Sequence, residues 1–377
     1  MDDLLRDIST CVRCGYCQAY CPTYRATRNE GYNARGRLQL AQNAITSEEY
    51  SEVFSKRVSQ CLLCGSCSEH CPPGIDVHGV IETLREDIIE QNGLTETAAR
   101  LKSNVGEIGN ITGDDQANRL LWLQSDTQVK LNEKAEVLYL TGCVPSLYPS
   151  AYSIPQSFVR ILNIAGVDFT LMGEKEICCG YPLAIGGLPH EAEKAAEKNI
   201  EAAKELGVSA VVTTCPSCYH TWKEYYPEML GYTPEIDVVH ATEFLLKLVQ
   251  EGKLSLSGPS ETVTYHDPCD LGRKSGIYDA PRELISACGA SLVEMRYSRG
   301  DAMCCGGGGN LESSDAVLSS KVSQERVRQA LDTGAGMIVS SCQQCKRTLQ
   351  GGARSLKARI KVMDVIEMVL KACEQEE

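Results

Sequence analysis

The chain has 377 residues, of which 43% are hydrophobic and 23% are charged, a composition typical of a globular protein with two or three domains. Its formal net charge of −13 argues against nucleic acid as a partner, because nucleic acid attracts a basic surface. No apolar run approaches the roughly 18–20 residues that span a bilayer, and acidic residues interrupt the N-terminus where a signal peptide would lie. The sequence therefore predicts a cytoplasmic protein, with any membrane association made through a partner.

Twenty cysteines are the most unusual feature of the composition. In a small secreted protein they would indicate disulfides, but this chain is long and has no signal peptide. The C-x2-C and C-C spacings in such a chain are typical of metal binding instead. Composition alone leaves zinc and iron–sulfur clusters open.

Two copies of the motif C-x2-C-x2-C-x3-C-P occupy residues 11–22 and 61–72. Three closely spaced thiolates hold three corners of a [4Fe–4S] cubane, and the fourth cysteine, before proline, ligates the other cluster. Gly15 and Gly65 suit the tight turns within the two motifs. Zinc knuckles are disfavoured, because zinc sites separate their two C-x2-C pairs by a longer loop. The predicted ligands are Cys11, Cys14, Cys17 and Cys71 for one cubane and Cys61, Cys64, Cys67 and Cys21 for the other.

The segments around these motifs have helical periodicity. Residues 34–58 and 75–91 place apolar side chains on one helical face, with a new helix expected to start near Ser47. We therefore predict a mostly helical ferredoxin domain over residues 1–91. Residues 92–134 are polar and lack cysteine, which predicts a linker with short helices in which Trp122 is buried.

From residue 135 the chain repeats itself, with an offset of 126 residues at the C-C pair and 127 at the C-x2-C pair. Helices and strands alternate, so each repeat, 135–260 and 261–377, is expected to be an α/β unit with a mainly parallel sheet. The complete chain is thus predicted to be an α+β multidomain protein. The cysteine segments follow predicted strands, whose carboxyl ends meet at one edge of a parallel sheet.

Each repeat supplies five cysteines, one more than a cubane or a zinc ion needs. Adjacent cysteines chelate one ion poorly but suit two neighbouring irons, which predicts a multi-iron cluster. Cys288 and Cys373 belong to neither group, and we interpret them as structural thiols. The first five-cysteine set is Cys143, Cys178, Cys179, Cys215 and Cys218, and the second is Cys269, Cys304, Cys305, Cys342 and Cys345.

A two-cluster ferredoxin motif followed by two such repeats resembles the D-type subunit of heterodisulfide reductase from methanogenic archaea, and each repeat resembles the CCG cysteine-rich domain. The resemblance covers nearly the whole chain, with YHDPC, CCGGGG and CKR in the expected order. It implies that each five-cysteine set binds a noncubane [4Fe–4S] cluster. It also implies a catalytic subunit that reduces the disulfide between coenzyme M and coenzyme B to two thiols, a step of methanogenesis.

The same architecture is similar to the iron–sulfur subunits of glycolate oxidase and related hydroxyacid dehydrogenases, and of anaerobic glycerol-3-phosphate dehydrogenase. In those relatives the clusters only relay electrons from a flavin subunit. The segment 34–38 resembles the relay subunits, whereas the completeness of both five-cysteine sets resembles the reductase. Because ligand count determines the chemistry, the reductase is the leading hypothesis and a non-catalytic electron-transfer subunit is the alternative.

The implied coenzymes carry sulfonate, phosphate and carboxylate groups, which require cations near the C-C-G loops. His266, three residues before Cys269, is a candidate proton donor. No G-x-G-x-x-G or Walker A run occurs, so no flavin or nucleotide site is expected. Electrons must then come from a redox partner, either a membrane b-type cytochrome or a soluble flavoprotein, and the sequence leaves that choice open. The candidate substrate-binding cations are Arg273, Lys274, Lys346 and Arg347.

Overall fold

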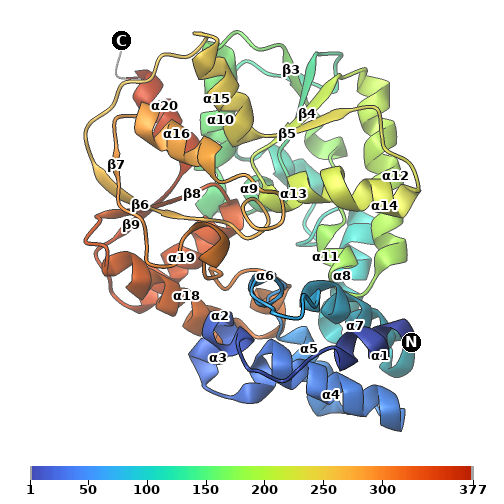
Figure 1. The fold of residues 1–377 in the computed structure, drawn as a ribbon. Coiled ribbons are helices and arrows are strands. Elements are labelled where there is room, and N and C mark those ends of the chain that lie inside the picture. The colour runs from blue at the N-terminus through green and yellow to red at the C-terminus, as the bar shows by residue number, and fades with distance from the viewer. Residues whose placement is uncertain (1, 375–377) are drawn as a thin grey trace.

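The structure is a computed structural model that describes residues 2–374. A helical N-terminal module lies beneath two α/β units that stand next to each other (Figure 1). The predicted α+β class is confirmed by this combination of a helical module with two separate sheets. Within residues 2–374, no helix combines the length and the apolar character needed to cross a membrane.

Polar caps begin two helices of the N-terminal module. Asn33 Oδ1 accepts a hydrogen bond from the Gly36 N–H (2.8 Å), and Ser51 Oγ accepts one from the Phe54 N–H (3.3 Å). The predicted break near Ser47 is confirmed, since one helix ends there and the next begins five residues later. The helices are α1 (Asp2–Ser9), α2 (Cys17–Tyr20), α3 (Pro22–Thr27), α4 (Ala34–Ser47), α5 (Glu52–Ser59), α6 (Ser66–Glu69) and α7 (Val77–Asn92).

The predicted linker contains more regular structure than short helices alone. It forms α8 (Glu96–Ser103), a π-helical turn η2 (Asn104–Ile108) and a 3₁₀ turn η3 (Gln116–Leu120). Trp122 is buried, as predicted. The strand β1 (Lys130–Leu131) was not predicted, and it pairs with a strand of the first repeat. The linker therefore extends the first sheet, while the domain boundaries at 92, 135 and 261 remain predictions.

Both sheets are entirely parallel, as predicted, and share one strand order once β1 is set aside. The first has the order β1-β3-β2-β4-β5 and the second β7-β6-β8-β9. All four residues of β2 are buried, which suits a sheet with helices on both faces. The strands are β2 (Val137–Leu140), β3 (Phe169–Leu171), β4 (Ala210–Thr213), β5 (Asp237–His240), β6 (Thr262–His266), β7 (Ser291–Leu292), β8 (Met337–Ser340) and β9 (Lys361–Asp364).

Helices cover both sheets, and the two α/β units share one apolar core. Phe158 and Leu162 of α10 lie in the same buried cluster as Val369 of α20, so the units are packed together. The helices of the first unit are α9 (Cys143–Leu147), α10 (Ser153–Ile164), α11 (Tyr181–Ala184), α12 (Pro189–Leu206), α13 (Pro216–His220), α14 (Tyr226–Leu230) and α15 (Ala241–Gln250). Those of the second are α16 (Asp279–Ala287), α17 (Leu311–Ser314), α18 (Ala316–Leu331), α19 (Gln343–Ser355) and α20 (Val365–Cys373).

Candidate iron–sulfur centres and the cavity between two of them

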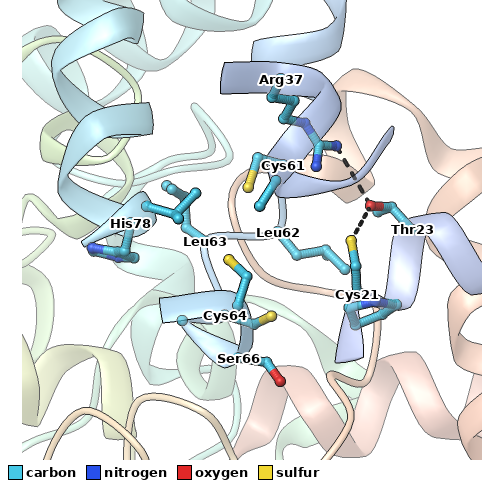
Figure 2. A pocket seen from close by; sticks show the side chains of 14 residues that line it. Cys21, Thr23, Arg37, Cys61, Leu62, Leu63, Cys64, Ser66 and His78 are labelled. Carbon is cyan, nitrogen blue, oxygen red and sulfur yellow. Dashed lines mark hydrogen bonds between the residues drawn. The ribbon is translucent and has the colours of Figure 1, made fainter. Parts of the chain in front are cut away.

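The ligands proposed for the second cubane surround one pocket. Figure 2 shows the sulfur atoms of Cys21, Cys61 and Cys64 facing a common space, and Cys67 also lines it. All these cysteines are free thiols. Four unbridged thiols around one small space fit a [4Fe–4S] cluster, so the ligand assignment made from the sequence is kept as a proposal.

Buried arginines hold the loop that carries these thiols. Arg37 donates to the carbonyls of Arg57 (2.7 Å) and Gln60 (2.8 Å), and Arg85 donates to the carbonyl of Cys61 (2.8 Å). Gly65 has a φ of +71°, and the corresponding Gly15 in the first motif has a φ of +77°, so both adopt the left-handed conformation expected of them. The side chains of Arg37 and Arg85 therefore hold this loop in place through its backbone carbonyls.

The ligands proposed for the other cubane lie nearer the surface. Cys11, Cys17 and Cys71 are partly exposed, and Cys14 is the one exposed cysteine among residues 2–374. Cys17 lies close enough to Cys11 and Cys21 for their charges to raise its pKa, although burial is the larger cause. The two proposed ligand sets thus meet at Cys17 and Cys21, with the first cubane site on the outer side.

The five cysteines of the first repeat form a continuous series of neighbouring thiols in the order 143, 178, 179, 218 and 215. Contacts from Cys178 and Cys218 lower the pKa of Cys179 to about 5, which makes it the centre of the set. Cys143 follows β2 and Cys215 follows β4, so parallel strands deliver them to one edge. The donor set fits a cluster with five thiolate ligands.

A buried ion pair supports Cys143. Arg119 of η3 pairs with Glu176 (2.9 Å), and the two side chains are 1% and 2% exposed. Arg119 also donates to the Cys143 sulfur (3.2 Å), while Glu176 accepts from the backbone N–H groups of Thr141 (2.9 Å) and Gly142 (2.7 Å). Burial raises the pKa of Glu176, and the charge of Arg119 opposes this rise. The linker therefore places a positive charge against a ligand of the first set.

The second set has the same internal order, 269, 304, 305, 345 and 342. Contacts from Cys304 and Cys345 lower the pKa of Cys305, so the second cysteine of the C-C pair is again central. The N–H groups of Gly306 and Gly307 lie 3.5 Å and 3.4 Å from the sulfurs of Cys304 and Cys305. Backbone N–H groups beside sulfur are a common means of stabilising cluster thiolates.

His266 lies against this second set. It is buried, and its ring lies within 4.8 Å of the Cys305 and Cys345 sulfurs. Its Nδ1 accepts a hydrogen bond from Arg326 Nε (3.0 Å), so the neutral ring carries its proton on Nε2. Burial lowers the pKa of His266, in agreement with a neutral ring. Its role as a proton donor to substrate stays a proposal, since the groups around it are Arg326 and the proposed ligands Cys305 and Cys345.

The predicted ligand sets lie next to one another in space. The Cys64 thiol lies beside Cys304, and this contact lowers the pKa of Cys64 to about 6. Cys342 of the second set lies near Cys215 of the first set. Contact with Cys345 lowers the pKa of Cys342, but burial and the charge of Cys215 raise it, and the net shift is upward. The cysteines thus form one series from the exposed Cys14 to the first repeat.

Arg273 fastens the ferredoxin module to the second repeat. It donates to the carbonyls of Cys64 (2.6 Å), Gly300 (2.8 Å) and Ala302 (2.7 Å). Hydrogen bonds from a charged donor contribute about 1.5–3 kcal/mol each. One guanidinium group therefore joins the second cubane loop to the loop that precedes the C-C pair of the second repeat.

Replacing Arg273 with alanine should therefore lower the thermal unfolding midpoint of the loaded protein and release iron on heating earlier than in the parent. Arg299→Ala is the matched control, because Arg299 is 49% exposed and its pair with Asp279 contributes at most about 1 kcal/mol. Both variants would be scanned at one heating rate with iron release followed in parallel. Equal midpoints for the two variants would contradict the assigned role.

Between the two five-cysteine sets lies a cavity of about 440 Å³. The linker covers it with Leu101, Asn104 and Ile111, and the C-C-G loop of the second repeat borders it. Its thiol lining comes from both repeats. The cysteines that line it are Cys143, Cys178, Cys179, Cys215, Cys218, Cys269, Cys305, Cys342 and Cys345.

One of the four predicted substrate-binding cations lines this cavity. Arg347 stacks on Tyr148 at 3.9 Å and donates to Gln344 (2.9 Å). The remaining three cations are not among its lining residues in the described part of the chain: Arg273 lies at the module junction, Lys274 pairs with Asp270 (3.0 Å), and Lys346 pairs with Glu367 (2.7 Å) and donates to Ser153 (2.9 Å).

Asp270 connects the two repeats beside the cavity. It accepts hydrogen bonds from Tyr181 (3.2 Å) and Ser217 (2.6 Å), both of the first repeat. Burial would raise the pKa of Asp270, but Lys274 and Ser217 outweigh this effect and lower it to about 2. Sequence reasoning did not identify Asp270 or Arg119, although the acidic residue directly after Cys269 was a visible signal.

Comparisons with known proteins agree with the domain order. The cysteine-rich CCG domain matches residues 137–223 and 263–350, and the 4Fe-4S dicluster domain matches residues 7–75. The fold is similar to that of a hypothetical protein from Helicobacter pylori, with a TM-score of 0.60 and 12% identity over 92% of this chain and 69% of that one. That similarity concerns the fold alone.

Curated relatives share more of the sequence. The EtfAB:quinone oxidoreductase of Syntrophomonas wolfei is 31% identical over 99% of this chain and 59% of its own length. The D-type subunit of the dihydromethanophenazine:CoB–CoM heterodisulfide reductase of Methanosarcina barkeri is 34% identical over 98% of this chain and 94% of its own length. With the two matched domains and this coverage of both sequences, the chain belongs to the family of D-type heterodisulfide reductase subunits, which are iron–sulfur oxidoreductases.

Proposed function

We propose that this chain is the catalytic subunit of a heterodisulfide reductase-type complex, which reduces a disulfide of the coenzyme M–coenzyme B type to two thiols. The observation that carries the proposal is the cavity of about 440 Å³ lined by cysteines of both complete sets. Both proposed clusters would occupy part of this space, and a disulfide held between them would lie within reach of both, which is the arrangement that a reductase needs. The name of the Methanosarcina barkeri relative gives independent support.

The residues that would hold the clusters follow from the ligand sets. Two ferredoxin-type cubanes would be held by the cysteines of the N-terminal motifs, and two noncubane [4Fe–4S] clusters by the five-cysteine sets. When bound, these clusters supply single electrons to a substrate in the cavity. The sequence contains no flavin or nucleotide motif, so the electrons are proposed to come from a membrane b-type cytochrome or a soluble flavoprotein partner.

The chain's own side chains would orient the substrate and exclude water. Leu101 and Ile111 of the linker cover the cavity with apolar groups, which lowers the local dielectric. Arg347 presents a guanidinium group at the wall, held by Tyr148 and Glu312. A fixed guanidinium binds a sulfonate, phosphate or carboxylate through paired hydrogen bonds.

Replacing Arg347 with alanine should therefore raise the KM for an anionic disulfide by about tenfold, which corresponds to about 1.4 kcal/mol of binding, with a smaller effect on kcat. Arg347→Lys keeps the charge but loses the planar guanidinium group that forms paired hydrogen bonds. Its KM should therefore lie between those of the parent and the alanine variant. Steady-state kinetics at matched iron content gives both constants. An unchanged KM, or a fall in kcat that parallels a loss of iron, would assign Arg347 a structural role instead.

The proposal itself is tested with anaerobically purified protein alone, with reduced viologen as donor and the coenzyme M–coenzyme B disulfide as acceptor. Iron and sulfide content and EPR spectra would be recorded on the same sample, before and after coenzyme M is added. Four [4Fe–4S] clusters correspond to about 16 iron atoms per chain. We expect viologen oxidation and a new paramagnetic signal on thiol addition. No turnover from a fully loaded sample would reject the isolated reductase.

In that event the alternative is a non-catalytic electron-transfer subunit of a flavin-dependent glycolate, lactate or other hydroxyacid dehydrogenase. The name of the Syntrophomonas wolfei relative, a quinone oxidoreductase, supports such a relay. The segment 34–38 resembles the relay subunits, but it supports this alternative only weakly. Arg37 in this segment donates to backbone carbonyls of the cluster loop, so its presence has a structural reason. The same viologen assay therefore separates the two functions.

A further inference from the structure

The surface around Cys14 differs from the surroundings of every other proposed ligand. Cys14 is exposed, while the cysteines of the two five-cysteine sets are buried or partly buried. Two large apolar side chains flank it, Val12 at 67% and Tyr16 at 52% exposure. Arg13 between them is also exposed. Exposed apolar side chains gathered at one place are typical of an interaction site.

The charge of residues 8–29, the segment that carries this surface, is opposite to that of the protein. The complete chain has 50 acidic and 37 basic side chains, yet residues 8–29 contain arginine at 13, 25 and 28 and no aspartate or glutamate. Arg28 is exposed, whereas Arg25 packs against Tyr297. The acidic residue that follows this segment, Glu30, is paired with Arg35. An acidic partner would therefore find complementary charge on this segment.

The loop is held in a fixed conformation. Arg35 of α4 donates to the carbonyl of Arg13 (3.0 Å), and the Arg13 side chain donates to Gln42 (3.4 Å) on the same helix. A side chain at Gly15 would collide with Arg35. A surface that is already ordered loses little conformational entropy when a partner binds.

The inner centres offer a protein partner no comparable approach. Cys64 is in contact with Cys304 at the junction between the modules, and the linker covers the cavity between the five-cysteine sets. The thiols that line that cavity are buried or partly buried, so a second protein would stay farther from them than from Cys14. Among the proposed centres, the one that includes Cys14 is therefore the one a protein can approach closely.

We propose that Val12, Arg13, Cys14 and Tyr16 form the docking surface for an acidic one-electron redox protein. The reduced partner would lose one electron, and the cluster held by Cys11, Cys14, Cys17 and Cys71 would gain it. Val12 and Tyr16 form the apolar centre of the contact, and Arg13 between them supplies its positive charge. The proposal rests on the iron–sulfur centres and not on which substrate the cavity accepts.

The probe for the test is a purified acidic two-cluster ferredoxin, photoreduced and mixed with the loaded protein in a stopped-flow instrument. Arg13→Glu and Val12→Glu should each lower the second-order rate of cluster reduction about tenfold at low salt, while Arg13→Lys should keep most of it. Binding of the same ferredoxin, measured by biolayer interferometry at two ionic strengths, should weaken in parallel. Reduction by methyl viologen should stay at the parent rate.

Arg328→Glu is the matched control, since it makes the same charge change at a 54% exposed arginine of α18. Equal slowing by Arg328→Glu and Arg13→Glu would attribute the effect to net charge and overturn the proposal. Unchanged ferredoxin rates and binding in Arg13→Glu and Val12→Glu would overturn it as well. Viologen-driven disulfide turnover by the same samples reports on the proposed reductase function independently, so failure of one proposal is distinguishable from failure of the other.

Discussion

Cys305→Ser is expected to lose about four iron atoms per chain and to lower disulfide turnover by more than about 100-fold, since even groups that only support a metal ligand contribute about 10–100-fold. Cys305 is the central thiol of the second set, in contact with Cys304, Cys345 and His266. A serine hydroxyl is a harder and less readily ionised ligand than thiolate, and it binds iron–sulfur clusters poorly. Iron analysis and the viologen assay on the same sample measure both effects.

Cys288→Ser provides the control, because Cys288 is buried but belongs to no predicted ligand set. It should retain the full iron content and turnover. Cys179→Ser, which replaces the central thiol of the first set, should reproduce the losses of Cys305→Ser if both sets act on one substrate. Full iron content in Cys305→Ser would contradict the ligand assignment, and turnover surviving in Cys179→Ser would contradict the paired-site mechanism.

The second large effect concerns Arg119. Arg119→Met should destabilise the protein by about 3–5 kcal/mol, because it leaves the carboxylate of Glu176 buried without its partner. The variant also removes the hydrogen bond to the Cys143 sulfur, so the cluster of the first set should be released more readily. Denaturant unfolding of apoprotein gives the stability change, and chelator-induced iron loss gives the effect on the cluster.

A double-mutant cycle separates the ion pair from the contact with sulfur. Adding Glu176→Gln to Arg119→Met removes the unpaired charge and should recover part of the lost stability, but not the resistance to chelator. Arg328→Met, at an exposed pair with Glu325, should cost at most about 1 kcal/mol. A double variant no more stable than Arg119→Met would show that the buried carboxylate is not the source of the loss.

Repeated patterns were the most predictable part of this structure. The spacing around Cys178 and Cys304 predicted two equivalent α/β units, and the strand order that the two sheets share confirms it. This worked because a buried parallel strand is a short apolar run whose carboxyl end fixes where the next residues lie. The gathering of five thiols at the edge of each sheet followed from the same rule.

Side chains that act across the repeats were not predictable. Arg273 and Lys274 are close in sequence to Cys269, and this closeness suggested that they bind the substrate. In the structure Arg273 donates to backbone carbonyls and Lys274 pairs with Asp270. Arg119 lies in a cysteine-free linker, and nothing in its local sequence indicates a contact with Cys143. Such roles depend on contacts with residues that are distant in the sequence. The local sequence around a residue carries no information about those contacts.

The junction between the first and last parts of the chain has a consequence for how the protein is made. Gln60 donates to Asp315 across 255 residues, and Arg25 donates to Met303 across 278 residues. Contacts of such long sequence separation form late, after the intervening chain has been synthesised and folded. The N-terminal thiols, including Cys64, therefore remain uncovered on the ribosome for most of translation. This interval leaves the ferredoxin loops open to cluster delivery before the second repeat closes over them.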